Sequence, residues 1–81
     1  MKVKMFYKTQ REIAEIINQV IDAYWENEIE ESELIVQLKY LYENNASKIS
    51  KNNEFTTILK QQCGKRRLEV LEKIIHQGEL K

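Results

Sequence analysis

Apolar side chains near the start of the chain recur at the spacing of an amphipathic helix. At about 100° per residue they fall on one face, formed by Ile13, Ile16, Ile17, Val20, Ile21 and Tyr24. Thr9 and Glu12 stand three positions apart just before this stripe, which is the spacing of a capping box. The pattern predicts a helix that begins after Thr9 and runs to about Glu26.

A second helical stripe follows after a short acidic stretch. Its apolar members are Leu34, Ile35, Leu38, Leu41 and Tyr42. Ile29 and Leu34 have the spacing of a hydrophobic staple, which predicts that this helix starts near Glu30. The polar run at residues 44–47 predicts its end, and residues 50–53 are expected to lead into the next element as a loop.

The third pattern is divided at Gly64. The apolar residues before it share one helical face and are Phe55, Ile58, Leu59 and Cys63. A continuous helix would bring Leu68, Leu71 and Ile75 out roughly opposite that face. The sequence therefore predicts a helix capped at Asn53, a break at Gly64, and a last helix over residues 65–77 that ends at Gly78.

Residues 3–7 have side chains that favour a strand, but no second strand is predicted for them to pair with. We expect an extended arm, with Phe6 or Tyr7 packed on the helices. The predicted fold is all-α: a compact four-helix domain with a short N-terminal arm and a C-terminal helix pair that resembles a helix-turn-helix. One domain is expected to span residues 1–81.

The charges balance overall but not along the chain. Lys plus Arg and Asp plus Glu each number 13, yet residues 1–47 carry five basic and nine acidic residues, whereas residues 48–81 carry eight and four. The halves therefore have formal charges of −4 and +4. They either attract each other in the fold or face different partners. A net charge of zero argues against binding nucleic acid by overall charge alone.

Several classes of protein are disfavoured. A single cysteine excludes an internal disulfide and a multi-cysteine metal site, and the glutamates around residues 26–33 lack a calcium-loop pattern. We expect no metal, no cofactor and no catalytic residue. No segment has the apolar length of a signal peptide or membrane span, so the expected location is the cytoplasm, away from membranes.

Charge, turn chemistry and helix ends meet around Gly64. Lys65 and Arg66 begin the last helix and point away from its apolar stripe. Outward residues of the preceding helix complete a surface that we call the basic turn surface: Thr56, Thr57, Lys60, Lys65 and Arg66. It is suited to nucleic-acid phosphates. The alternative is structural, because cations beyond a helix end also favour that helix's exposed carbonyls.

Arg67 and Cys63 have simpler explanations. Arg67 falls within the apolar arc of the last helix, which favours an internal ion pair with a carboxylate of the acidic half. Cys63 lies on the apolar side of its helix and is expected to be buried. Nothing in the sequence brings a base such as His76 next to it, so an enzyme is not expected.

Other exposed positions favour contact with a protein. Val36 and Tyr40 fall on the side of the second helix opposite its stripe, and Trp25 lies at the end of the first. Together they are candidates for a protein interface. Isolated exposed apolar residues are also common in proteins without partners, so this interpretation has a structural alternative. A homodimer is a further expectation.

Three segments resemble a known group of proteins: residues 6–8, residues 25–29, and residues 54–57 with 63–69. The chain resembles, from about Phe6 to Ile75, a family of small uncharacterised proteins from low-GC Gram-positive bacteria and their mobile elements. The resemblance implies a bacterial cytoplasm and a phage-linked setting. It supplies no catalytic or binding residue.

The sequence thus favours a small non-enzymatic regulatory protein that binds nucleic-acid phosphates, of DNA or RNA, at the basic turn surface. The alternative is a protein-interaction module or inhibitor that uses the apolar surface of the first two helices.

Overall fold

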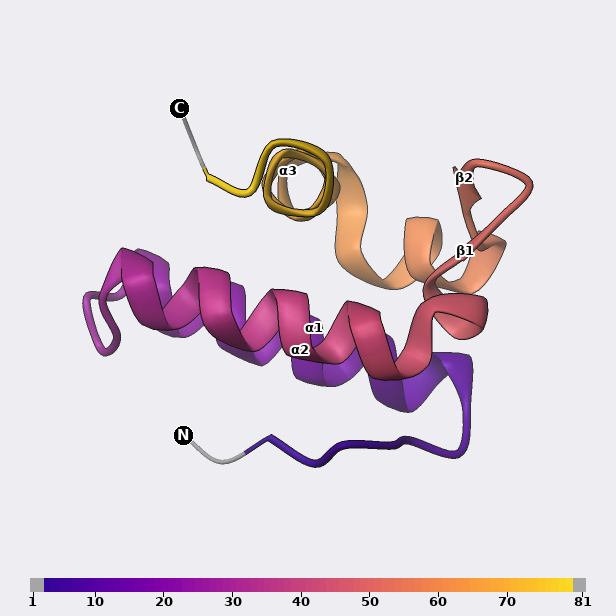
Figure 1. The fold of residues 1–81 in the computed structure, drawn as a ribbon, viewed down its shortest axis with the longest axis horizontal. Helices are drawn as coiled ribbons and strands as arrows, with labels where there is room; N and C mark the ends of the chain where they lie inside the picture. Colours follow the sequence, from indigo (N-terminus) through magenta and orange to yellow (C-terminus); the bar gives the residue numbers. More distant parts are fainter. Residues whose placement is uncertain (1–2, 80–81) are drawn as a thin grey trace.

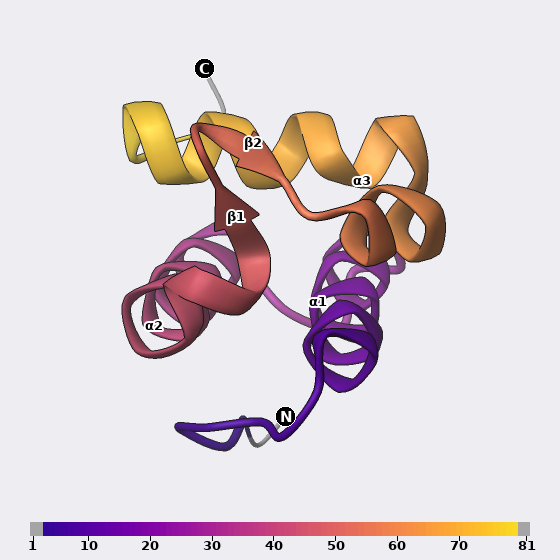
Figure 2. The same cartoon turned by 90° about the vertical axis from the view of Figure 1, so that its right-hand side faces the viewer.

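The computed structural model describes residues 3–79 and consists of three helices and a small hairpin. In chain order the elements are α1 (Gln10–Trp25), α2 (Glu31–Ile49), β1 (Ser50–Lys51), β2 (Glu54–Phe55) and α3 (Thr57–Gln77). α1 and α2 form a pair, with the N-terminal arm on one side and α3 on the other (Figures 1 and 2). A mostly helical fold is confirmed, but the expected four-helix domain is corrected to three helices and a two-stranded sheet.

α1 begins as the sequence predicts. The Thr9 hydroxyl accepts a hydrogen bond from the Glu12 backbone N–H at 3.1 Å, and the Glu12 carboxylate accepts one from the Thr9 N–H at 3.3 Å. These bonds satisfy donors that a helix start leaves without partners. The helix ends at Trp25, and Asn27 turns the chain with a positive φ of 63°.

The core is drawn from all three helices. Its largest fully buried side chains are Ile13, Ile17, Val20, Ile21, Leu34, Leu38, Leu41, Ile49, Leu59, Leu71 and Ile74. Burying each such side chain contributes about 1.5–3 kcal/mol, which offsets the entropy lost when the chain orders. Nearly all of them belong to the stripes identified in the sequence, whereas Ile49, the last residue of α2, lies outside those stripes.

α2 does not end in the run 44–47. Asn45 has a non-helical backbone (φ −137°, ψ 30°), but the helix continues past this kink to Ile49. The Asn45 side chain is only 2% exposed, and its Nδ2 donates to the Leu41 carbonyl at 3.1 Å. This hydrogen bond satisfies the buried amide of Asn45. The asparagine therefore lies at a kink within α2, and the helix ends four residues later at Ile49.

Asn45 also binds the N-terminal arm. Its Nδ2 donates to the Met5 carbonyl at 2.9 Å, and its Oδ1 accepts from the Tyr7 N–H at 3.2 Å. Tyr7 is half-buried against the core, whereas Phe6 is 65% exposed. The expected arm is therefore present, and of the two aromatic residues Tyr7 is the one that packs on the helices.

The hairpin was not predicted. Ser50 pairs with Phe55 and Lys51 with Glu54 in an antiparallel register. Asn52 and Asn53 connect the strands with φ values of 54° and 67°, the left-handed conformation that asparagine tolerates in two-residue hairpin turns. Asn53 is therefore a turn residue and not the N-cap of the next helix.

Thr56 caps α3 instead. Its hydroxyl accepts from the Leu59 N–H at 3.4 Å and donates to the Lys48 carbonyl at 3.2 Å. The predicted break at Gly64 is confirmed, because its backbone (φ 80°, ψ 168°) is a conformation open mainly to glycine. We call residues 57–63 the first segment of α3 and residues 65–77 the second segment; they run in different directions (Figures 1 and 2). Gly78 ends the helix in a left-handed conformation, as predicted.

Replacing Asn45 by alanine tests whether this residue fastens the arm. Asn45→Ala removes three hydrogen bonds, and we expect it to lower the free energy of unfolding by about 2 kcal/mol. Asn44→Ala is the matched control, since Asn44 is less buried and bonds only the Tyr40 carbonyl; its effect should stay below about 0.5 kcal/mol. Urea unfolding followed by circular dichroism measures both, and equal losses in the two variants would contradict the role of Asn45.

Candidate nucleic-acid interface at the break in the third helix

Residues on one side of α1 contact the residues around the break at Gly64 in α3. Ala14, Asn18 and Asp22 lie four residues apart, so they line the same side of the helix. The Asn18 Nδ2 donates to the Gln62 carbonyl at 2.9 Å, and the Cys63 Sγ lies 4.0 Å from the Ala14 carbonyl oxygen. A helix that ends leaves its last carbonyls without partners, so Asn18 satisfies one that the break exposes.

Arg67 joins both sides of the break to α1. Its Nε and Nη2 donate to the two oxygens of Asp22, each at 2.9 Å, and its Nη1 donates to the Cys63 carbonyl at 3.1 Å. This two-pronged geometry is the strong form of an arginine–carboxylate pair. The predicted ion pair with the acidic half is confirmed, and Arg67 is not a free cation.

Trp25 lies against the same break. The guanidinium carbons of Arg66 and Arg67 are 5.5 Å and 5.7 Å from the centroid of its ring, within cation–π range. The side chain remains 42% exposed. The sequence grouped Trp25 with Val36 and Tyr40, whereas the structure brings it to Arg66. One signal was available, because Trp25 follows Asp22 by three positions and so lies on the side of α1 that meets Arg67.

Lys65 and Arg66 are exposed at the start of the second segment of α3. Within residues 3–79, ion pairs join Lys60 to Glu54 and Arg67 to Asp22, and no carboxylate lies within 4 Å of the Lys65 or Arg66 charge. The helix dipole is also positive at this end. Within the described residues, Lys65 and Arg66 therefore carry their charges without a direct ion pair.

The structure divides the basic turn surface. Lys65 shares a shallow hollow with Lys60, Glu69 and Glu72, while Arg66 faces Trp25. The two carboxylates lower the positive potential on the Lys65 side. Arg66 does not line this hollow and faces Trp25 instead, although Glu69 follows it by three positions on the same helix.

Two of the remaining members of the basic turn surface already form interactions within the chain. Thr56, Thr57 and Lys60 line a second hollow beside the hairpin. The Thr56 hydroxyl is used in capping, and Lys60 Nζ lies 3.5 Å from the Glu54 carboxylate. Thr57 is exposed. An anion at this hollow would compete with Glu54 for Lys60.

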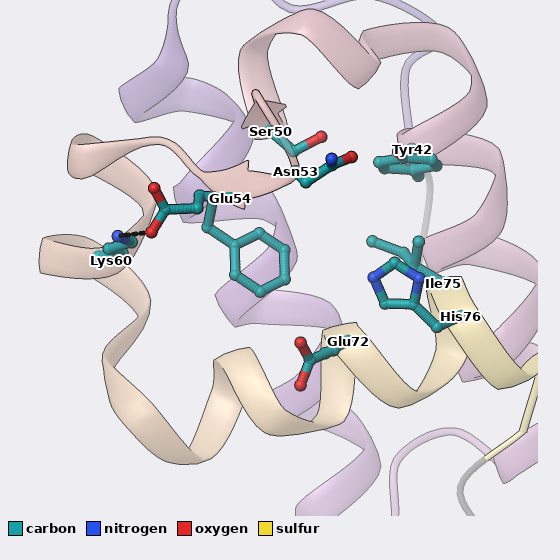
Figure 3. Close-up of a pocket in the computed structure, with 9 residues that line it drawn as sticks. Tyr42, Ser50, Asn53, Glu54, Lys60, Glu72, Ile75 and His76 are labelled. Atoms are coloured by element: carbon teal, nitrogen blue, oxygen red, sulfur yellow. Dashed lines mark ion pairs between the residues drawn. The ribbon is translucent and has the colours of Figure 1, made fainter.

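A pocket of about 250 Å³ opens between α2, the hairpin and the second segment of α3 (Figure 3). Tyr42, Ile75 and His76 lie together at one end, and the Glu54–Lys60 ion pair lies at the other. Its size suits a single side chain or a small ligand. Sequence reasoning missed it, because the pocket depends on the unpredicted hairpin.

Cys63 is buried, as predicted. Burial raises the pKa of its thiol from 9.0 to about 11, and the Arg67 guanidinium lowers that pKa only in part. The thiol is therefore neutral near pH 7 and a poor nucleophile. Cys63 faces α1, whereas His76 lines the pocket, so the structure does not bring this pair together.

Among residues 3–79, no group of three or more His, Cys, Asp or Glu side chains is arranged to hold a metal ion. No helix in this part of the chain has the length and apolar character needed to cross a membrane.

The arrangement is that of a small helical protein whose exposed chemistry is a cationic helix start beside a tryptophan. The chain belongs to the CLB_0814 family of conserved hypothetical proteins, whose family model matches residues 4–76. The resemblance to an uncharacterised family is thereby confirmed. Neither a curated protein nor a solved structure matches the chain.

Single substitutions of Arg66 and Arg67 test whether Arg67 stabilises the fold while Arg66 does not. Lysine cannot reproduce the paired bonds of Arg67 to Asp22. We therefore expect Arg67→Lys to lower the free energy of unfolding by about 1–2 kcal/mol. The loss is no larger because the pair is partly exposed to solvent. Arg66→Lys keeps the charge at an exposed site and should change stability by less than about 0.5 kcal/mol. Urea unfolding of both variants measures the difference. A loss for Arg66→Lys as large as that for Arg67→Lys would contradict this division of roles.

Proposed function

We propose that the protein binds nucleic acid through its phosphates at the start of the second segment of α3. The observation that carries the proposal is the pair of exposed cations, Lys65 and Arg66, with no carboxylate of residues 3–79 within ion-pair distance. Two cations at the positive end of a helix destabilise that helix by about 0.3–1 kcal/mol each. A sequence that keeps such a local conflict commonly does so at a functional site.

Phosphate binding would relieve this conflict. A phosphate at a helix start accepts hydrogen bonds from backbone N–H groups and from cationic side chains, and it compensates the helix dipole. Arg66 has the donors for a two-pronged bond to phosphate, and Lys65 supplies a mobile point charge. Thr57 and Lys60 are secondary members of the proposed site, with Thr56 supporting them through its cap.

The proposal describes a regulatory protein that binds and does not catalyse. The neutral Cys63 thiol is in keeping with this role. The resemblance to small proteins of low-GC Gram-positive bacteria and their mobile elements supports a cytoplasmic and phage-linked setting as part of the proposal.

Fluorescence polarisation with labelled DNA and RNA at low and at physiological salt tests the proposed function. Phosphate contacts make affinity fall as ionic strength rises. The logarithm of the binding constant falls with the logarithm of the salt concentration by a slope of about 0.7–0.9 for each phosphate contacted. We expect Lys65→Ala/Arg66→Ala to weaken binding at least tenfold and to reduce the salt slope by about 1.4–1.8 for two lost contacts.

The matched control is Lys8→Ala/Lys39→Ala, which removes two exposed cations from the acidic half and changes the net charge equally. Its affinity and salt slope should equal those of the unmodified protein. Absence of binding at low salt, or equal losses in the two double variants, would reject the proposal.

A second candidate function rests on α2. Val36 is 65% exposed and Tyr40 37% exposed, and their spacing of four residues sets them on one side of the helix. The apolar stripe of α1 is covered within the chain, so Val36 and Tyr40 are the exposed apolar residues of α2 that support a protein interface. We propose a second copy of the chain as the partner, which would make this face a dimer contact.

Analytical ultracentrifugation tests the dimer. The protein should exceed its 9.7 kDa monomer mass as concentration rises. Val36→Ser/Tyr40→Ser should remain monomeric, because the contact would lose its apolar area. A constant monomer mass for the unmodified protein would reject this candidate and leave the nucleic-acid proposal unaffected.

A further inference from the structure

We propose that the nucleic acid is single-stranded, with an unpaired base stacked on Trp25 and the neighbouring phosphate bound by Arg66. This inference rests on the proposed function and adds the class of ligand. Its basis is the juxtaposition of an exposed indole and an exposed guanidinium that come from residues 41 positions apart.

Trp25 is partly open to solvent. Its 42% exposure leaves part of the indole open to solvent, at the end of α1 where the chain turns away. The paired bonds of Arg67 to Asp22 hold one guanidinium at 5.7 Å from the ring centroid, so the indole has a fixed neighbour. A base that stacks on the ring would take the place of the Arg66 guanidinium, which is exposed, while the Arg67 pair stays in place.

Arg66 can bind the neighbouring phosphate once the base has taken its place on the ring. Its guanidinium carbon lies 5.5 Å from the Trp25 centroid, and none of its nitrogens is within 4 Å of a carboxylate of residues 3–79. Aromatic stacking combined with a nearby cation is the usual means of binding single strands without sequence preference. Lys73 follows Arg66 by two helical turns on the same side, with Glu69 between them.

The acidic side of the second segment disfavours a duplex. Glu69 and Glu72 are exposed and line the hollow that contains Lys65. A helix inserted in a major groove is flanked by both phosphate backbones, so these carboxylates would be repelled there. A single strand bound at Trp25 and Arg66 passes only Glu69, which follows Arg66 by three positions, whereas Glu72 lies about 120° further round the helix.

Stacking also explains why the site needs a base as well as a phosphate. Lys65, Arg66 and Lys73 provide few phosphate contacts, and a few such contacts give only weak, salt-sensitive affinity. One stacked base adds about 1–3 kcal/mol, which corresponds to roughly 5–150-fold in affinity. The expected ligand is therefore an unpaired stretch of DNA or RNA, or the unpaired loop of a folded RNA.

Trp25 is the single tryptophan of the chain, so its fluorescence reports directly on the site. The unmodified protein is titrated with short single-stranded DNA, single-stranded RNA, duplex DNA and inorganic tripolyphosphate, which carries the charge without a base. We expect both single strands to quench the emission and to bind at least tenfold more tightly than the duplex. Tripolyphosphate should cause no comparable quenching.

Variants at Trp25 are compared by polarisation of a labelled single strand. Trp25→Leu should weaken binding about tenfold, and Trp25→Phe, which keeps an aromatic face, should recover part of the loss. Circular dichroism and urea unfolding confirm that each variant is folded. The quenching of the unmodified protein provides evidence that requires no variant.

The outcomes separate the two proposals. Binding of duplex and single strands with equal affinity, together with no quenching and no loss in Trp25→Leu, would overturn the single-strand inference and leave phosphate binding at Lys65 and Arg66 standing. Absence of binding to every nucleic acid at low salt would overturn both. A preference of one single strand over the other, with quenching, supports the inference and identifies DNA or RNA as the ligand.

Discussion

The fold depends on how the chain stops and restarts a helix at Gly64. Such a break exposes carbonyl groups that cannot be left without partners inside a protein. Asn18 takes the carbonyl of Gln62, and Arg67 takes that of Cys63 while it binds Asp22 with two hydrogen bonds. Asn18 of α1 and Arg67 of α3, which is held by Asp22 of α1, thus satisfy two carbonyls at the break. The second segment of α3 can then turn across the α1–α2 pair and close the core (Figure 2).

The same arrangement determines the chemistry that remains exposed. Of the three consecutive cations after Gly64, Arg67 is used to hold the break, which leaves Lys65 and Arg66 in solvent. Trp25 packs beside this ion pair and so ends next to Arg66. A structural ion pair and the proposed binding site therefore share one tryptophan. This link gives the proposals their specificity, since a generic basic patch would not include an aromatic ring held by a paired arginine.

The features of the fold that the sequence predicted correctly are those that depend on local patterns. The capping box at Thr9, the break at Gly64 and the stop at Gly78 each depend on a few neighbouring residues, and all three are present. The ion pair of Arg67 could be predicted because a guanidinium within an apolar arc needs a partner. Three other features depended on distant contacts. The Asn45 side chain, within α2, binds the distant arm. The hairpin forms where two asparagines were interpreted as a loop. In the basic turn surface, Lys65 lines a hollow with Glu69 and Glu72, whereas Arg66 lies beside Trp25 of α1.

The arrangement at the break is tested most directly by proton NMR of the Trp25 ring. Its indole protons should show nuclear Overhauser contacts to the side chains of both Arg66 and Arg67, whose methylene protons should shift upfield in the ring current, because both guanidinium carbons lie within 6 Å of the ring centroid. Backbone contacts should be interrupted at Gly64. An uninterrupted helix through Gly64, with no contact from the Trp25 ring to either arginine, would contradict the account.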